Sequence, residues 1–336
     1  MLSDRKEESG VPTIGFVISE KENERRRAIL PAALKAVQNP HLVMVEQGYG
    51  KILNISDQAY LDAGAKIAAR AECLRQDVVC DPKIGDASFL GQLSDRQTIF
   101  GWVHAERNPE LTTLLLQRGL TALAWEDMYQ NGRHVFWRNN ELAGEAAVLH
   151  ALTLFGKLPY TCKVAVIGRG NTGRGAFRIL TSLGAEVTVY NRRTEKLLRQ
   201  EIGQYDIIVN SVFWDMTRKD YLISREDLAR MKKPSMIVDV SCDLDGAIES
   251  SHPTTFEEPV FMDSGILHYA VDHTPSIFSF SVSSILSKII AHYIDPITES
   301  KTHEHPVLNN AIIIEKGRIL DKKTIRFQKR DRLEQA

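Results

Sequence analysis

Residues 163–173, with the sequence K-V-A-V-I-G-R-G-N-T-G, constrain the fold more than any other part of the chain. They have the order of a buried strand, a glycine-rich turn and the start of a helix, and a second apolar strand follows at 187–190. This order is that of a dinucleotide-binding βαβ unit, whose helix N-terminus offers N–H groups and a positive dipole end to a pyrophosphate. We therefore expect the following cofactor contacts: Gly168, Arg169, Gly170, Asn171, Thr172 and Gly173 in the turn, and Ser211 after a later strand.

The residues after the second strand indicate which dinucleotide binds. NAD sites usually carry Asp or Glu about 20 residues past the first glycine, where the carboxylate binds the ribose 2′-OH. This chain has Asn191, Arg192 and Arg193 at that position, so no carboxylate repels a 2′-phosphate and two guanidinium groups can bind one. The pattern predicts NADPH over NADH, with these three residues as contacts; an ordinary solvated turn is the alternative.

Composition excludes several classes of protein. A chain of 336 residues is expected to form two domains, and its 43% hydrophobic and 25% charged residues are typical of a soluble globular protein. The formal net charge of −1 gives no field that would attract nucleic acid. The polar N-terminus is unlike a secretory signal, and no apolar run is expected to span a membrane. Four cysteines without a C-x-x-C pair predict reduced thiols, no metal site and a cytoplasmic location.

Strand and helix patterns alternate on both sides of a long helical pattern at 140–155. Such alternation predicts an α/β fold, here two Rossmann-like domains with a cleft between them. A second long helical pattern, at 276–293, would return the chain, so that the first domain is discontinuous: residues 1–140 plus 290–336 for substrate, and 141–289 for NADP. The apolar run at 311–314 is expected to pack as a strand or against a neighbour, and the basic residues after it to be solvated.

Several polar residues follow expected strands, where ligands collect in doubly wound domains. Lys83, His104 and Asp243 each come shortly after an apolar strand, and Arg25 and Arg26 lie in the loop after the first strand. A single lysine in a loop is usually solvated, and a single histidine at a strand end is usually structural. Their common placement, beside a hydride cofactor site, is what favours a functional interpretation.

A set of motifs in a fixed order resembles the alanine dehydrogenase and pyridine nucleotide transhydrogenase family, which also includes saccharopine dehydrogenases. The resemblance covers residues 13–291. Its motifs are R-R-A-I-L-P at 26–31, D-P-K at 81–83, W-V-H-A-E-R-N-P-E-L at 102–111, G-L-T-A-L-A-W-E at 119–126, V-D-V-S-C-D at 238–243, P-T-T at 253–255 and H-Y at 268–269.

Within that family, the chain looks most like the members that make N-(carboxyethyl) amino acids. It is shorter than typical alanine dehydrogenases, and it has D-P-K-I-G-D at 81–86 where those enzymes have K-x-K-E-P. The Asn-Arg-Arg sequence at 191–193 and the segment 266–276 also resemble those members of the family. The resemblance implies NADPH-dependent reduction of an imine formed between a 2-oxo acid, pyruvate, and the side-chain amine of a diamino acid, ornithine or lysine. Family members are multimeric, which implies a homodimer or a homotetramer.

The same resemblance assigns roles to the polar residues. Arg26 and Lys83 would bind the pyruvate carboxylate, with Arg25 as a neighbour. His104 would move protons, because an imidazole titrates near neutral pH, and Lys83 could share that role. Asp243 would orient a polar group or the cofactor ribose near the reacting carbon.

Alternatives remain open at the level of the sequence. An alanine dehydrogenase would use ammonia, a saccharopine-type enzyme would join 2-oxoglutarate to lysine, and a non-catalytic protein would only sense NADP. The residues that recognise the second amino acid are also open, with Glu126, Asp127, Glu145 and Arg107 as candidates. His268 and His273 are further candidates for contacts with cofactor or substrate.

Overall fold

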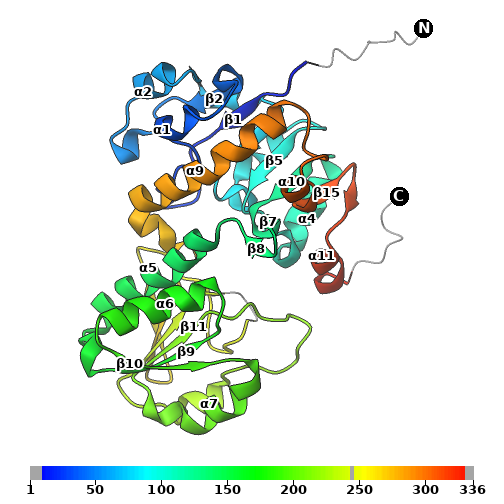
Figure 1. The fold of residues 1–336 in the computed structure, drawn as a ribbon. Coiled ribbons are helices and arrows are strands. Elements are labelled where there is room, and N and C mark those ends of the chain that lie inside the picture. Colours follow the sequence, from blue (N-terminus) through cyan, green and yellow to red (C-terminus); the bar gives the residue numbers. More distant parts are fainter. Residues whose placement is uncertain (1–9, 243–245, 330–336) are drawn as a thin grey trace. The chain divides into compact units, whose positions relative to one another are not determined.

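The computed structural model describes residues 10–242 and 246–329. Asp243, one of the expected site residues, lies outside them. The chain forms two compact units (Figure 1). Unit 1 comprises Met1–Phe136 and Ser279–Ala336, and unit 2 comprises Trp137–Phe278. The α/β architecture expected from the alternating strand and helix patterns is confirmed in both units.

Unit 1 is built on an eight-stranded sheet with the order β16-β15-β6-β5-β4-β1-β2-β3. The six strands from β6 to β3 in this order are parallel, whereas β15 pairs antiparallel with β6 and β16 pairs antiparallel with β15. The expected apolar strand near the C-terminus therefore exists, and it pairs with β6. The bounds are β1 (Ile14–Phe16), β2 (Val43–Glu46), β3 (Lys66–Ala68), β4 (Val78–Cys80), β5 (Thr98–Gly101), β6 (Thr121–Ala124), β15 (Ile312–Glu315) and β16 (Arg318–Ile319).

The helices of unit 1 are mostly short, and α1, α4 and α10 each begin at a proline. Helix α9 is the exception, and it carries the chain back into this unit beside α1. Its Ser283 and Ser287 hydroxyls accept the backbone N–H groups of Arg27 and Leu30 at 2.8 and 2.7 Å. The bounds are α1 (Pro31–Leu34), α2 (Asp57–Asp62), α3 (Arg70–Cys73), α4 (Pro109–Gln117), α9 (Ser279–Thr298), α10 (Pro306–Asn310) and α11 (Lys322–Phe327).

The segment Thr274–Thr298 is the one helix of the described residues that is long and apolar enough to cross a membrane, judged by length and composition alone. The expectation that no apolar run reaches this length is therefore wrong. Val282, Leu286, Ile290 and Ile294 of α9 recur every fourth residue and are fully buried. This spacing gives one apolar stripe along a helix, as in the packed helix of a globular core, so a single candidate is weak evidence for a membrane span.

The C-terminal segment packs more closely than the sequence indicates. Its basic residues were expected to be solvated, but the Lys323 ammonium bonds the Asp127 carboxylate at 2.5 Å. The side-chain amide of Gln328 donates to the carbonyl oxygen of Ala105 at 2.6 Å and to the Thr112 hydroxyl at 3.0 Å. Helix α11 thus docks on the turn that follows β5, while its basic residues Lys322 and Arg326 are exposed as expected and Lys323 is partly covered.

Unit 2 has a six-stranded sheet with the order β10-β9-β11-β12-β14-β13, all parallel except β13 at one edge. The first strand, β9, lies between β10 and β11, so the chain crosses in one direction and then in the other. This is the switch point at which doubly wound sheets bind ligands. The bounds are β9 (Lys163–Ile167), β10 (Glu186–Tyr190), β11 (Ile207–Asn210), β12 (Met236–Asp239), β13 (Val260–Asp263) and β14 (Ile266–Tyr269).

Both faces of this sheet are covered by helices, as Figure 1 shows for α6 and α7. Val164 and Val166 of β9 lie in one apolar cluster with residues of α5 and α6, whereas Ala165 and Ile167 lie in another with residues of α7 and α8. A strand whose alternate side chains are all buried explains why the sequence of β9 is a continuous apolar run. The helices are α5 (Trp137–Phe155), α6 (Asn171–Ser182), α7 (Glu195–Glu201) and α8 (Arg225–Leu228).

Candidate active site

The turn between β9 and α6 accepts only glycine at two of its positions. Gly168 has a φ of +107°, and a Cβ atom there would stand 2.7 Å from the Ser211 hydroxyl oxygen. A Cβ atom on Gly173 would stand 2.4 Å from the carbonyl oxygen of Gly168. The turn is therefore tight, and α6 begins directly against the end of β9.

The outer side of the same turn is open. Gly170 is the N-cap of α6 and, as a glycine, has no side chain that could cap the helix, and nothing lies within 4 Å of the position that a Cβ atom would take. The exposed or half-exposed residues around it are Arg169, Asn171 and Thr172. Uncapped N–H groups at the start of a twelve-residue helix, next to open space, fit the pyrophosphate of a dinucleotide. Ser211 instead donates its hydroxyl to the carbonyl oxygen of Ile167 at 2.6 Å, so it holds the end of β9.

The tip after β10 carries two exposed guanidinium groups on a fixed turn. The Asn191 side chain accepts the backbone N–H of Arg193 at 2.8 Å, and the Thr194 hydroxyl accepts the backbone N–H of Asn191 at 2.9 Å. This reciprocal capping holds the backbone, while the side chains of Arg192 and Arg193 stay exposed. The tip can therefore present its guanidinium groups to an anion without rearranging the turn.

In unit 1, the turns that follow β4 and β5 lie against each other. The backbone N–H of Gly85 donates to the carbonyl oxygen of Trp102 at 3.0 Å, and that of Trp102 donates to the carbonyl oxygen of Pro82 at 3.3 Å. Lys83, in the first turn, is buried, and its ammonium lies 3.4 Å from the Asp86 carboxylate. His104 is two residues past Trp102, so the structure brings the expected lysine and histidine to one edge of one sheet.

His104 has an unusual backbone and an acidic surrounding. Its φ of 51° and ψ of 38° place it in the left-handed region, although it is not glycine. The Glu126 carboxylate, which follows β6, accepts the backbone N–H groups of Val103 and His104 at 3.2 and 2.5 Å. The imidazole Nδ1 lies 4.0 Å from a carboxylate oxygen of Glu106 and from one of Glu126.

The pKa values of this group are shifted in directions that suit proton transfer. Desolvation lowers the pKa of the His104 imidazole, the Glu106 charge opposes this, and the Lys83 charge adds to it. Half of the His104 side chain is exposed, so this desolvation comes from the protein around the ring, not from complete burial. Burial raises the pKa of Glu106 and raises that of Glu126 to about 7. His104 is therefore neutral near pH 7 and can accept a proton.

Arg26 lies at the same edge of the sheet, in the loop after β1. Its Nε and Nη2 atoms donate to the two carboxylate oxygens of Glu24 at 2.8 and 2.5 Å, and its guanidinium lies over the Trp102 ring, 5.0 Å from the centroid. The side chain is only 3% exposed, so its direction is fixed. The neighbouring Arg25 is exposed. Sequence reasoning missed Glu24 and Trp102, although Glu24 stands just two residues before the arginine that it binds.

Most other candidates from the sequence have structural partners. Glu145 binds Arg138 and Arg178, and Asp127 binds Lys323. Arg107 approaches Glu106 at 3.8 Å. His268 is buried and bonds the Ser250 hydroxyl at 2.8 Å and the Ile266 carbonyl oxygen at 3.0 Å. His273 contacts Asp272 at 2.5 Å.

The described residues contain one group whose atoms could hold a metal ion, formed by His104, Glu106 and Glu126 within 4.8 Å of one another. The Glu126 oxygens already accept backbone N–H groups. The group is therefore explained by its role around His104, and the expectation of no metal stays a prediction.

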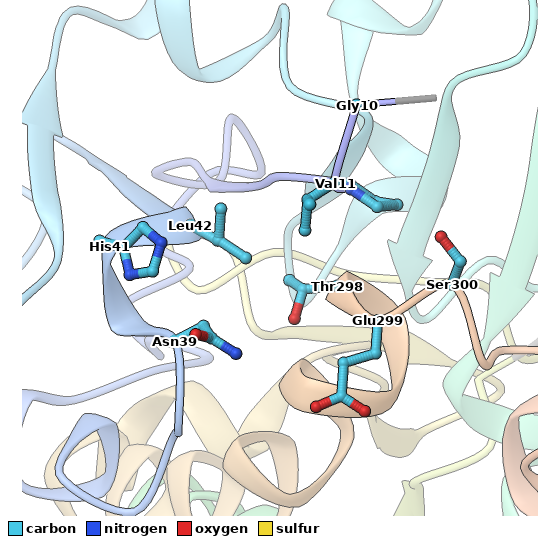
Figure 2. A pocket seen from close by; sticks show the side chains of 9 residues that line it. Gly10, Val11, Asn39, His41, Leu42, Thr298, Glu299 and Ser300 are labelled. Carbon is cyan, nitrogen blue, oxygen red and sulfur yellow. The ribbon is translucent and has the colours of Figure 1, made fainter. Parts of the chain in front are cut away.

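A cavity of about 510 Å³ in unit 1 lies elsewhere (Figure 2). Its lining comes from the segment before β1 (residues 10–12), from the segment before β2 (Asn39, His41 and Leu42) and from the end of α9 with the two residues after it (residues 298–300). In a parallel sheet these positions belong to the edge opposite the one that carries Lys83 and His104. The cavity is therefore separate from the candidate active site.

Comparisons with known proteins agree with this arrangement. The N-terminal domain profile of the family described as alanine dehydrogenase/PNT matches residues 16–137, and its C-terminal profile matches residues 191–322. The N(5)-(carboxyethyl)ornithine synthase of Lactococcus lactis subsp. lactis is 30% identical over 84% of this chain and 95% of its own length. The chain belongs to the alanine dehydrogenase/pyridine nucleotide transhydrogenase family. The family resemblance expected from the ordered motifs is thereby confirmed.

Members of this family are oxidoreductases that act on CH–NH bonds and bind a pyridine nucleotide. An alanine dehydrogenase of Halomonas elongata is 30% identical over 76% of this chain and 79% of its own length. A solved L-alanine dehydrogenase superposes with a TM-score of 0.80, at 21% identity, over 96% of this chain and all of that one. The last comparison shows that the fold is shared.

Proposed function

We propose that this protein condenses pyruvate with the side-chain amine of ornithine, or of lysine, in an NADPH-dependent reduction that gives an N-(carboxyethyl) amino acid. The observation that carries the proposal is the similarity to the carboxyethylornithine synthase of Lactococcus lactis, which extends over nearly all of that enzyme. Arg26, Lys83 and His104 all fall within the residues matched by the N-terminal family profile. The proposal assigns the substrates to residues 1–140 and 290–336, and NADP to residues 141–289.

The buried cations of unit 1 suit a small anionic 2-oxo acid. Glu24 holds two nitrogens of the Arg26 guanidinium, so the group is oriented before a ligand arrives. Lys83, a buried residue, supplies an ammonium group. Charges screened from water bind a carboxylate more strongly than exposed charges do, and this favours pyruvate binding by Arg26 and Lys83. Arg25 would add positive charge from the exposed side of the loop.

His104 suits the proton transfers that imine formation needs. The amine nitrogen bonds to the carbonyl carbon and gives one proton to the carbonyl oxygen, which becomes a hydroxyl. The nitrogen then gives up its second proton while the hydroxyl takes one and leaves as water, which forms the C=N bond. An imidazole that is neutral near pH 7 can accept each proton from the nitrogen and return it to the oxygen. When bound, the nicotinamide supplies hydride to the imine carbon. Asp243 would orient a polar group near that carbon.

The cofactor preference follows from the tip after β10. Asn191 fixes the turn, and Arg192 and Arg193 would bind the 2′-phosphate of NADPH in two-pronged contacts. The turn residues Gly168 to Gly173 would bind the pyrophosphate. We also propose a homo-oligomer, a dimer or a tetramer, in the cytoplasm.

A panel of substrates tests the proposal. The protein is incubated with NADPH and pyruvate plus ornithine, lysine or ammonium, and with 2-oxoglutarate plus lysine, and both NADPH absorbance and product mass are followed. We expect turnover with ornithine or lysine and a product that is heavier than the amino acid by a carboxyethyl group. Faster turnover with ammonium would favour alanine dehydrogenase, as the Halomonas relative suggests. NADPH binding without turnover on any amine would favour a sensor.

A further inference from the structure

The backbone of His104 needs an external support. A residue with a Cβ atom in the left-handed region is strained, and such conformations persist only where the surroundings fix them. Gly101, three residues earlier, has ordinary φ and is packed tightly, since a Cβ atom there would stand 2.0 Å from the carbonyl oxygen of Asp81. The chain is therefore held at the end of β5, and the turn at His104 must be stabilised from another element.

Glu126 provides that support. One of its carboxylate oxygens accepts the backbone N–H of His104 at 2.5 Å and that of Val103 at 3.2 Å, and the other oxygen also lies 3.2 Å from the Val103 nitrogen. These two N–H groups point in one direction because the backbone turns at His104. The carboxylate thus binds the left-handed turn itself, and it would lose a partner if His104 relaxed.

The residue before Glu126 is held in place by an aromatic cluster. Trp125, the preceding residue, is fully buried, and its ring contacts Phe100, Trp102 and Phe136 at centroid distances of 5.5, 4.8 and 4.9 Å. Phe100 and Trp102 belong to the segment that leads to His104. The aromatic cluster therefore fixes the start of the turn after β6 relative to the turn after β5. The Glu126 carboxylate then joins the two turns through its hydrogen bonds.

We propose that Glu126 is a positioning residue for His104, which holds the histidine in its left-handed conformation and so directs the imidazole toward the substrate. This rests on the proposed function, in which His104 moves the protons. A protonated carboxyl group keeps a carbonyl oxygen that can accept an N–H. The support therefore persists when Glu126, whose pKa lies at about 7, changes its protonation state.

Two substitutions of Glu126 distinguish its role as a hydrogen-bond acceptor from its negative charge. Glu126→Ala removes the acceptor, and we expect kcat to fall by about 10- to 100-fold, the size expected when a catalytic group is displaced by about an ångström. Glu126→Gln keeps an acceptor oxygen, and its kcat is expected to stay within about threefold of wild type. The KM for NADPH should be unchanged in both. Glu110→Ala, an exposed glutamate in the first turn of α4, is the matched control.

A double-mutant cycle tests whether Glu126 acts through His104. In a His104→Ala background, Glu126→Ala should lower the residual kcat by less than about twofold, because the group that it positions is gone. Equal losses in both backgrounds would overturn the inference. Wild-type activity of His104→Ala would instead remove the histidine from the proposed mechanism.

Hydrogen–deuterium exchange gives a readout that needs no substrate. The amides of Val103 and His104 should exchange faster in Glu126→Ala than in wild type, and near the wild-type rate in Glu126→Gln and Glu110→Ala. Unchanged exchange rates of the peptides that contain β1 and β2 would show that the fold of unit 1 is intact. Equal protection of these two amides in wild type and Glu126→Ala would refute the inference even if the proposed reaction is confirmed.

Discussion

The Cβ atom that Gly85 lacks would stand 2.2 Å from the carbonyl oxygen of Val103. This contact joins the turn that carries Lys83 to the residue before His104, and a backbone oxygen cannot move aside as the end of a flexible side chain can. The distance between the lysine and the histidine is therefore set by the absence of a side chain at position 85.

Replacing Gly85 by alanine should separate the two turns. Insertion of a methyl group into a tightly packed site typically costs about 1–3 kcal/mol, and we expect a loss of stability in that range in urea denaturation. We also expect kcat to fall, because the separation displaces Lys83 and His104. Gly91→Ala is the control, since nothing lies within 4 Å of its Cβ position. Equal stability of the two variants would contradict the argument.

Removal of the Lys83 ammonium should weaken the binding of the 2-oxo acid more than the binding of the cofactor. Lys83→Ala is expected to raise the KM for pyruvate about tenfold or more, since a charge-assisted contact to a carboxylate is lost. The KM for NADPH should stay the same. Lys35→Ala, an exposed lysine of unit 1, serves as the control. If steady-state kinetics gave wild-type pyruvate parameters for Lys83→Ala, the proposed carboxylate site would be wrong.

The sequence predicts those elements whose signals are local. The strand, turn and helix start expected at 163–173 are β9 and the beginning of α6, and the strand expected at 187–190 is β10 (Glu186–Tyr190), because apolar runs and glycines mark them without reference to the rest of the chain. The strand β3 (Lys66–Ala68) was missed. It is partly exposed and lies at the edge of the sheet, where it pairs with β2, and no local pattern reveals this pairing.

The residues of the candidate site also fall into two groups, those that a local pattern predicts and those that depend on the three-dimensional fold. The position of a residue after a strand indicates that Lys83 and His104 belong to one edge of a sheet. The contact of Glu126 with the backbone of His104 joins residues 22 positions apart and depends on the neighbouring order of β5 and β6. The docking of Gln328 on Ala105 spans 223 positions. Such contacts follow from the three-dimensional order of the strands, so the sequence alone could not supply them.

The bond between Lys323 and Asp127 should contribute to stability. Lys323→Ala would leave a carboxylate of low exposure without its partner, and its already raised pKa would rise further. The lysine is 41% exposed, so solvent screening limits the expected loss to about 1 kcal/mol. Thermal or urea denaturation measures it, with the adjacent exposed Lys322→Ala as the control. If both variants had the same stability, the docking of α11 through this pair would have no energetic role.

Asp81 should make the protein less stable as pH rises. Burial raises the pKa of this carboxyl group to about 7, although the backbone N–H of Lys83 donates to it at 2.9 Å. Between about pH 4 and pH 7 the folded chain therefore binds more protons at this site than the unfolded chain, and the free energy of unfolding falls with increasing pH.

Asp81→Asn removes this titration. From pH 5 to pH 8, the free energy of unfolding of this variant should rise relative to that of wild type by an amount on the order of a few kcal/mol. Urea denaturation across that range measures the difference. Asp95→Asn, at an exposed position, should show a constant difference from wild type. A constant difference for Asp81→Asn as well would mean that Asp81 is ionised over the whole range.

The arginine tip should decide between the two nicotinamide cofactors. Replacing Arg192 and Arg193 by alanine removes two planar donors that can bind the 2′-phosphate, and the KM for NADPH should rise about 10- to 100-fold. NADH has no such phosphate, so its KM should change by less than about twofold. Since the Asn191 side chain caps the backbone of the tip, the turn itself should survive the change. Lys196→Ala, an exposed cation on α7, controls for the general loss of positive charge. Equal effects on NADPH and NADH would show that the tip does not recognise the phosphate.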